Sequence, residues 1–170
     1  MKFQLESVRS FRHPADPSCP MIFICAGTGF APMRGLLQKR AHFHSRGAEL
    51  GPAYLVFGSR SSNEGMFFLN EIKEFQEKGA LTQAFLCYSR EPGQKKEYIT
   101  DKLRSKECKD LLGSVLGEAK THIFICGSAS MADESKHALK EISSPSCFDA
   151  IEKEQRLHYD VFGALPPSKN

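Results

Sequence analysis

The residues best suited to chemistry in this 170-residue chain lie directly after short apolar runs. Ala26-Gly27-Thr28-Gly29 ends one such run and precedes an amphipathic stretch that begins at Pro32. At a strand-to-helix junction, free backbone N–H groups and the positive end of the helix dipole favour an anion. The two glycines would let the backbone approach a phosphate, and the Thr28 hydroxyl adds a donor. The stretch has neither G-x-G-x-x-G nor a Walker lysine, so a plain tight turn is the alternative.

A second polar stretch, Ser89-Arg90-Glu91, follows another apolar run, and Lys96 and Tyr98 come a few residues later. Hydroxyl, guanidinium and ammonium groups suit a phosphate, and a tyrosine offers a flat face to a base. An arginine at this place in a doubly wound sheet favours a 2′-phosphate, and therefore NADP over NAD. Taken by itself, a solvated basic loop is the more common explanation of such a stretch.

Cys126-Gly127-Ser128 closes a further apolar run, where a cysteine usually belongs to the core. Asp160 and Phe162, near the chain end, are ordinary strand residues when taken alone. The six cysteines include no C-x-x-C pair, and several lie inside apolar runs. We therefore expect no metal site and a reducing, cytoplasmic compartment.

Composition bounds the class of protein further. A net charge of +3, with 41% apolar and 25% charged residues, indicates neither a disordered chain nor a nucleic-acid-binding surface. No apolar run approaches the roughly 18 residues that a membrane span needs, so we expect no membrane contact from this piece. The length suits one domain with a sizeable core.

Short apolar runs alternate with longer amphipathic runs along the chain, and this alternation predicts the strands and helices that position these residues. Apolar runs of strand length, rich in Ile, Val, Phe and Tyr, occupy residues 21–26, 53–58, 83–89, 121–127 and 157–162. Longer amphipathic runs occupy residues 32–47, 67–79, 96–117, 130–142 and 148–156. This alternation predicts an α/β fold with a parallel sheet covered by helices on both faces. We expect a lead-in at 1–20, the domain at 21–162 and a tail at 163–170.

Together the stretches resemble the NADP-binding domain of the ferredoxin–NADP reductase superfamily, in the diflavin reductase branch that includes the NADPH–cytochrome reductases. The resemblance runs from Val8 to Phe162 and rests on six segments in the family's order: VRSFRHP, AGTGFAP, GALTQAFLCYSRE, QKKEYIT, CGSASMA and RLHYDVF. It implies a doubly wound, five-stranded parallel sheet of strand order 3-2-1-4-5. The tetrapeptide IFIC, at 22–25 and 123–126, would then lie in two neighbouring buried strands that open into one crevice.

The resemblance also implies a role for each motif residue. Gly27, Thr28 and Gly29 would bind the pyrophosphate. The 2′-phosphate would be held by Ser89, Arg90 and Lys96. Tyr98 would stack near the adenine, and Thr100 stands where the family often has Gln. The nicotinamide loop would contribute Gly127, Ser128, Met131 and Glu134.

Cys126 would lie beside the nicotinamide C4, and Asp160 would belong to the same hydride-transfer cluster. Phe162 takes the place of the aromatic that covers the flavin ring. Two departures concern the subfamily: Cys25-Ala26 replaces the common Gly-Pro, and Ser128 stands where many members have Asp.

The function implied is that of a C-terminal domain that binds NADP(H) and serves hydride transfer from NADPH to FAD. The family's FAD-binding and FMN-binding domains are absent, so we expect a fragment that binds NADP(H) without turnover. Its partners would be those two domains and a redox acceptor such as a haem protein. Two alternatives remain: a non-enzymatic NADPH-sensing module, and a self-contained NAD-dependent Rossmann dehydrogenase. The second needs an acidic residue near the end of the second strand, where Gly58-Ser59-Arg60 stands instead.

Overall fold

The computed structural model describes residues 11–163, which form a five-stranded parallel sheet with helices on both faces. Its strands are β1 (Met21–Ala26), β2 (Ala53–Ser59), β3 (Gln83–Tyr88), β4 (His122–Ser128) and β5 (Leu157–Phe162). They lie in the order β3-β2-β1-β4-β5, which confirms the predicted fold. The chain reverses its winding between β1 and β4, and in such sheets ligands bind at this point.

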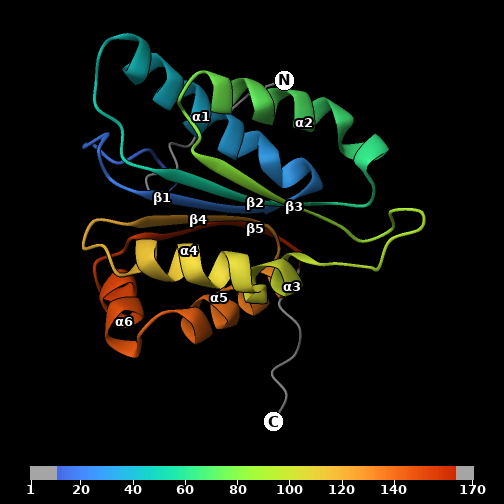
Figure 1. Ribbon diagram of the computed structural model, residues 1–170. Coiled ribbons are helices and arrows are strands. Elements are labelled where there is room, and N and C mark those ends of the chain that lie inside the picture. The colour runs from blue at the N-terminus through green and yellow to red at the C-terminus, as the bar shows by residue number, and fades with distance from the viewer. Residues whose placement is uncertain (1–10, 164–170) are drawn as a thin grey trace, which may run out of the picture.

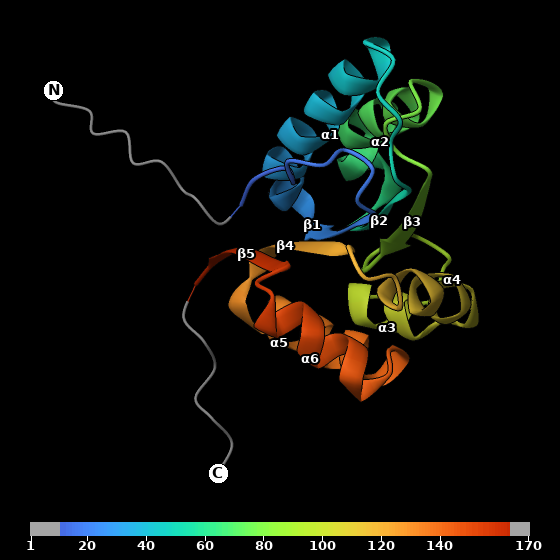
Figure 2. The ribbon, with the colours of Figure 1, turned by 90° about the vertical axis from the view of Figure 1, so that its left-hand side faces the viewer.

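Two layers of helices enclose the sheet (Figures 1 and 2). One face carries α1 (Phe30–Ser45) and α2 (Ser62–Glu77). The opposite face carries α3 (Ile99–Arg104), α4 (Lys106–Leu116), α5 (Ala129–Ile142) and α6 (Pro145–Lys153). Because side chains alternate along a strand, each central strand supplies both cores. Phe23 and Cys25 pack with α1 and α2, and Ile22 and Ile24 pack on the other side.

The repeated tetrapeptide pairs with itself. In the register of β1 with β4, the partners are Ile22↔Ile123, Phe23↔Phe124, Ile24↔Ile125 and Cys25↔Cys126. All eight residues are buried, as expected for two neighbouring strands covered on both faces. The prediction that both copies line the centre of one sheet is therefore confirmed.

The amphipathic run at 96–117 forms two helices rather than one. Ser105 has extended backbone angles (φ −61°, ψ 150°) and ends α3, and its side chain then caps α4 by accepting a bond from the Cys108 N–H. A serine hydroxyl competes well for the free N–H groups of a helix start, so the chain turns here instead of continuing.

β5 is an edge strand, and most of its side chains remain partly or largely exposed. On the face that carries α1 and α2, the ring of His158 stacks on the ring of Phe124, with the two ring centres 4.5 Å apart. The Nε2 atom of His158 also lies 2.9 Å from Nδ1 of His122 on β4. These contacts fasten the edge strand that carries Asp160 and Phe162.

Part of the predicted lead-in packs on the domain. The ring of Phe11 meets that of Phe124 edge-on at 5.2 Å, and Cys19 is buried. The domain boundaries at 20 and 162 stay a prediction, since residues 1–10 and 164–170 lie outside the described part. Within residues 11–163, no helix combines the length and apolar character that crossing a bilayer requires.

Candidate functional site

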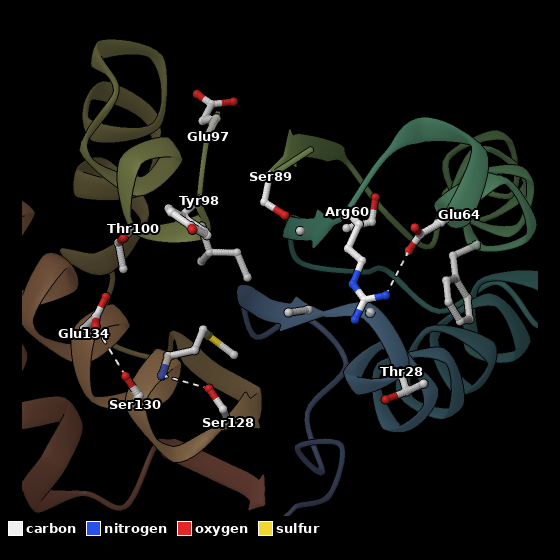
Figure 3. A pocket seen from close by; sticks show the side chains of 17 residues that line it. Thr28, Arg60, Glu64, Ser89, Glu97, Tyr98, Thr100, Ser128, Ser130 and Glu134 are labelled. Carbon is white, nitrogen blue, oxygen red and sulfur yellow. Dashed lines mark hydrogen bonds and ion pairs between the residues drawn. The ribbon is translucent and has the colours of Figure 1, made fainter. Parts of the chain in front are cut away.

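A cavity of about 710 Å³ opens at the carboxyl ends of β1 to β4 (Figure 3). Ligand pockets in proteins commonly measure about 300–1,000 Å³, so this one has room for a nucleotide-sized molecule. Its walls come from the turns after four strands, from the first turn of α3 and from the first two turns of α2 and α5. The lining residues are Ala26, Gly27, Thr28, Gly58, Ser59, Arg60, Glu64, Phe68, Ser89, Glu97, Tyr98, Ile99, Thr100, Ser128, Ser130, Met131 and Glu134.

The turn after β1 is a single 3-10 turn, η1 (Gly27–Gly29), that leads directly into α1. Gly27 has a positive φ of 50°, a conformation that glycine adopts readily. Gly29 is buried against β4: a Cβ atom there would lie 2.4 Å from the Cys126 carbonyl oxygen. The turn thus rests directly on the neighbouring strand, and a side chain at 29 would force the two apart.

Side chains from the ends of β2 and β3 form a second wall. Ser59, Arg60 and Ser89 all line the cavity, and in Figure 3 Arg60 lies between Ser89 and Thr28. The Arg60 guanidinium is 3.9 Å from the Glu64 carboxylate. Both side chains are more than half exposed, and such surface pairs stabilise a fold by about 0–1 kcal/mol. Arg60 is therefore available to an anion in the cavity.

A third wall is the start of α3. The exposed ring of Tyr98 borders the cavity, and the Lys96 ammonium lies 4.7 Å from the centre of that ring. The Tyr98 N–H donates to the Asp101 carboxylate at 2.9 Å, which fixes the backbone beneath the ring. Thr100 adds a hydroxyl next to it. An aromatic face with a neighbouring cation suits a flat base.

The floor is the junction of β4 with α5. Ser128 caps α5 by accepting a bond from the Met131 N–H at 3.2 Å, and Ser130 donates to Glu134 at 3.3 Å. The Met131 side chain passes over Gly127, where an added Cβ would lie 2.2 Å from the methionine methyl group. The absence of a side chain at Gly127 therefore allows the Met131 side chain to pack closely against the backbone of β4.

Cys126 lies behind this surface rather than in it. The residue is 4% exposed, and burial first, then the charge of Asp160, raises the pKa of its thiol to about 11. At neutral pH the thiol is protonated and is no nucleophile. A Cβ on Gly29 would lie 3.4 Å from the Cys126 Sγ, so the thiol stands directly behind the turn.

The structure brings many of the predicted residues together, and it places others outside. The cavity is lined by Gly27, Thr28, Ser89, Tyr98, Thr100, Ser128, Met131 and Glu134. Gly29 and Gly127 lie in its supporting backbone, whereas the wall does not include Arg90, Lys96, Cys126, Asp160 and Phe162. Asp160 and Phe162 are the register partners of Cys126 and Ser128 on exposed β5.

Sequence reasoning missed several lining residues, of which Arg60 is the clearest. It directly follows β2, in the same position after a strand that drew attention to Ser89. Gly58-Ser59-Arg60 carries the same signal in the sequence, a cation directly after an apolar run. Ser59, Glu64, Glu97 and Ser130 were missed as well.

The donor set fits a phosphate-bearing dinucleotide. Hydroxyls from three walls and the Arg60 guanidinium face one cavity, and the N-terminal end of α1 follows the η1 turn. Three carboxylates also line it, and each has a partner: Glu64 with Arg60, Glu97 with Lys102 at 3.0 Å, and Glu134 with Ser130. Across residues 11–163, no cluster of three or more His, Cys, Asp or Glu side chains could hold a metal ion.

Comparison with known proteins gives the family. The model of the oxidoreductase NAD-binding domain matches residues 23–137. Inducible nitric oxide synthase of Rattus norvegicus is 37% identical over 95% of this chain, and that of Homo sapiens 34% over 96%. Nitric oxide synthase 3 of Sus scrofa is 32% identical over 94%.

The chain spans only 14–15% of the length of these relatives. The matches and the strand order agree with the resemblance stated from the motifs. The chain belongs to the oxidoreductase NAD-binding domain family, as a nicotinamide dinucleotide-binding domain of the ferredoxin–NADP reductase superfamily in its diflavin reductase branch.

Proposed function

We propose that this domain binds NADP(H) and presents it to the FAD of a longer flavoprotein reductase. That reductase would pass electrons on, through FMN, to a haem protein or another acceptor. One observation carries the proposal: the η1 turn, Ser89 and Tyr98 converge on a single cavity at the point where the sheet reverses its winding. The partners are then the FAD-binding and FMN-binding domains of the parent and its redox acceptor.

The residues of this chain bind and orient the cofactor, which supplies a hydride when it is bound. Backbone N–H groups of the η1 turn hold the pyrophosphate, with the Thr28 hydroxyl beside them. Tyr98 offers its ring to the adenine. Cys126 packs behind Gly29, and it does not line the cavity; nor does Asp160. In this proposal the nicotinamide would come to lie beside these two residues when the cofactor binds. Phe162 stays exposed on the edge strand, where a flavin from another domain can meet it.

Two arginines hold different phosphates in this proposal. Arg60 lines the same cavity as Thr28 and Ser89, and its guanidinium would hold the pyrophosphate. Arg90 stands at the rim, next to Ser89, and turns toward a 2′-phosphate when one binds. Lys96 leaves the Tyr98 ring for the same group. The domain therefore prefers NADP to NAD, because NAD lacks the phosphate that Arg90 and Lys96 hold.

Titration calorimetry with NADP⁺ and NAD⁺ tests this assignment. We expect the unsubstituted domain to bind NADP⁺ more tightly than NAD⁺, without turnover. Arg90→Ala should weaken NADP⁺ binding by about 1.5–3 kcal/mol, the range for a hydrogen bond to a charged group, and leave NAD⁺ nearly unchanged. Arg60→Ala should weaken both.

Arg46→Ala is the matched control, because Arg46 is exposed at the far end of α1, about 24 Å along the helix from the η1 turn. It should change neither affinity. Equal affinities of the unsubstituted domain for the two dinucleotides would refute the NADP assignment.

A further inference from the structure

Glu91 makes a tight contact that the proposed site does not use. Its carboxylate accepts from the Ser62 N–H at 2.6 Å and from the Ser62 hydroxyl at 2.9 Å. Glu91 belongs to the loop after β3, and Ser62 is the first residue of α2, which follows β2. The Glu91 carboxylate therefore binds the loop after β3 to the start of α2, the helix that follows the neighbouring strand β2.

The contact suits a helix start. The first N–H groups of a helix have no partner within it, and the helix dipole favours a negative charge there. Ser61 already caps α2 by accepting from the Glu64 N–H, so Glu91 satisfies a different donor. Hydrogen bonds to a charged acceptor are about twice as strong as neutral ones.

Two backbone bonds continue the same seam. Ser89 N–H donates to the Ser59 carbonyl at 3.0 Å, and Arg90 N–H donates to the Arg60 carbonyl at 2.6 Å. They join the chain that leaves β3 to the chain that leaves β2, within the second wall of the cavity. The loop is closed at its base by the Glu97 N–H, which donates to the Tyr88 carbonyl at 3.0 Å. Between Arg90 and Glu97, the loop is held to α2 by the side chain of Glu91.

We infer that Glu91 is a positioning residue for dinucleotide selectivity. By holding its loop on α2, it keeps Ser89 and Arg90 where a 2′-phosphate is received. The inference rests on the proposed function, because it assigns the selectivity of that site to one further residue. Glu91 itself does not line the cavity, so it would act through its loop.

Preorganisation gives the direction of the effect. A loop that is already in place costs less to order when the ligand binds. Loss of Glu91 should therefore weaken the ligand that uses the loop, NADP⁺, and leave the ligand that lacks a 2′-phosphate, NAD⁺, close to its original affinity. A side chain that only supports the fold would weaken both ligands alike.

Calorimetric titration of the whole chain with NADP⁺ and NAD⁺ measures this ratio of affinities. We expect Glu91→Ala to lower it about tenfold, equivalent to about 1.4 kcal/mol, and Ser62→Ala, which removes one of the two bonds, to lower it about threefold. Glu91→Gln should fall between, since its amide retains one acceptor oxygen. The matched control is Glu74→Gln, on the same helix, whose carboxylate pairs with Lys78 at 3.1 Å on the exposed surface.

The possible results separate the two proposals. A preference for NADP⁺ that survives Glu91→Ala unchanged would overturn the positioning role and leave the proposed function intact. No preference in the unsubstituted chain would overturn the proposed function, and the positioning role with it. If Glu91→Ala does not fold, Ser62→Ala decides: a lowered ratio supports the role, and an unchanged ratio refutes it.

Discussion

Replacing Gly29 by alanine tests how the η1 turn is seated on the sheet. Gly29 has φ −61° and ψ −9°, ordinary helical angles that alanine adopts without strain. The added methyl group is therefore the whole perturbation. It would lie 2.4 Å from the Cys126 carbonyl oxygen and 3.0 Å from the carbonyl carbon, which are backbone atoms of a central strand.

The magnitude follows from what has to move. Because β4 is paired on both sides, with β1 and β5, it yields little, and the turn must lift instead. Overpacking of this kind typically costs about 1–3 kcal/mol. For a domain of this size each kcal/mol lowers the melting temperature by about 2–4 °C. Gly29→Ala should also weaken NADP⁺ binding, since the displaced turn carries the pyrophosphate donors.

Gly35→Ala is the matched control. Gly35 lies on the exposed side of α1, and a Cβ there would meet no atom within 4 Å. Alanine is favoured over glycine inside a helix by about 1 kcal/mol, so this variant should be more stable than the original chain. Thermal denaturation followed by circular dichroism measures both variants. If Gly29→Ala melts at or above the original temperature, the close seating of the turn on β4 is wrong.

Two further predictions concern the ionisation of His122 and the accessibility of the cysteines. Burial first, then His158, Arg156 and His13, lower the pKa of His122 to about 4 from its ordinary 6.5. Between these values the unfolded chain binds a proton that the folded domain does not, so the free energy of unfolding should fall by about 2.5 kcal/mol as pH drops from 6.5 to 4. Urea titrations should show a flatter pH dependence for His122→Asn, and an unchanged slope would contradict this. Of the six free cysteines, five are buried, so maleimide labelling followed by mass spectrometry should modify Cys147 alone in the folded domain and all six in denaturant; rapid labelling of Cys126 would count against its burial.

The sheet was predictable because its signals are local and strong. Five short apolar runs separated by amphipathic helical segments are compatible with few sheet topologies, and the order of the family's motifs selects one of these topologies. The split of residues 96–117 was not predicted, since a serine inside an amphipathic run is compatible with both a helix interior and a cap. Only the packing of α3 and α4 as separate helices on β1 to β4 decides between them.

The site was predicted in part because the sheet topology fixes which chain segments meet at its edge. Residues such as Thr28, Ser89 and Tyr98 follow strands or precede helices, so topology alone brings them to one edge. Whether a side chain then turns into the cavity depends on backbone angles of the turn, which the sequence does not specify. Arg90 and Arg60 follow neighbouring strands, yet only Arg60 lines the cavity.

The self-paired tetrapeptide has a consequence for how the chain folds. Two copies of Ile-Phe-Ile-Cys lie parallel and in register, with like residues side by side, and none of them carries a charge. In an unfolded chain, either copy is an equally good partner for the same segment of another molecule, and short uncharged β-forming segments stack in this manner in fibrils. Until both copies are covered by helices, correct pairing within one molecule competes with pairing between molecules. Refolding of this domain should therefore lose yield steeply as protein concentration rises.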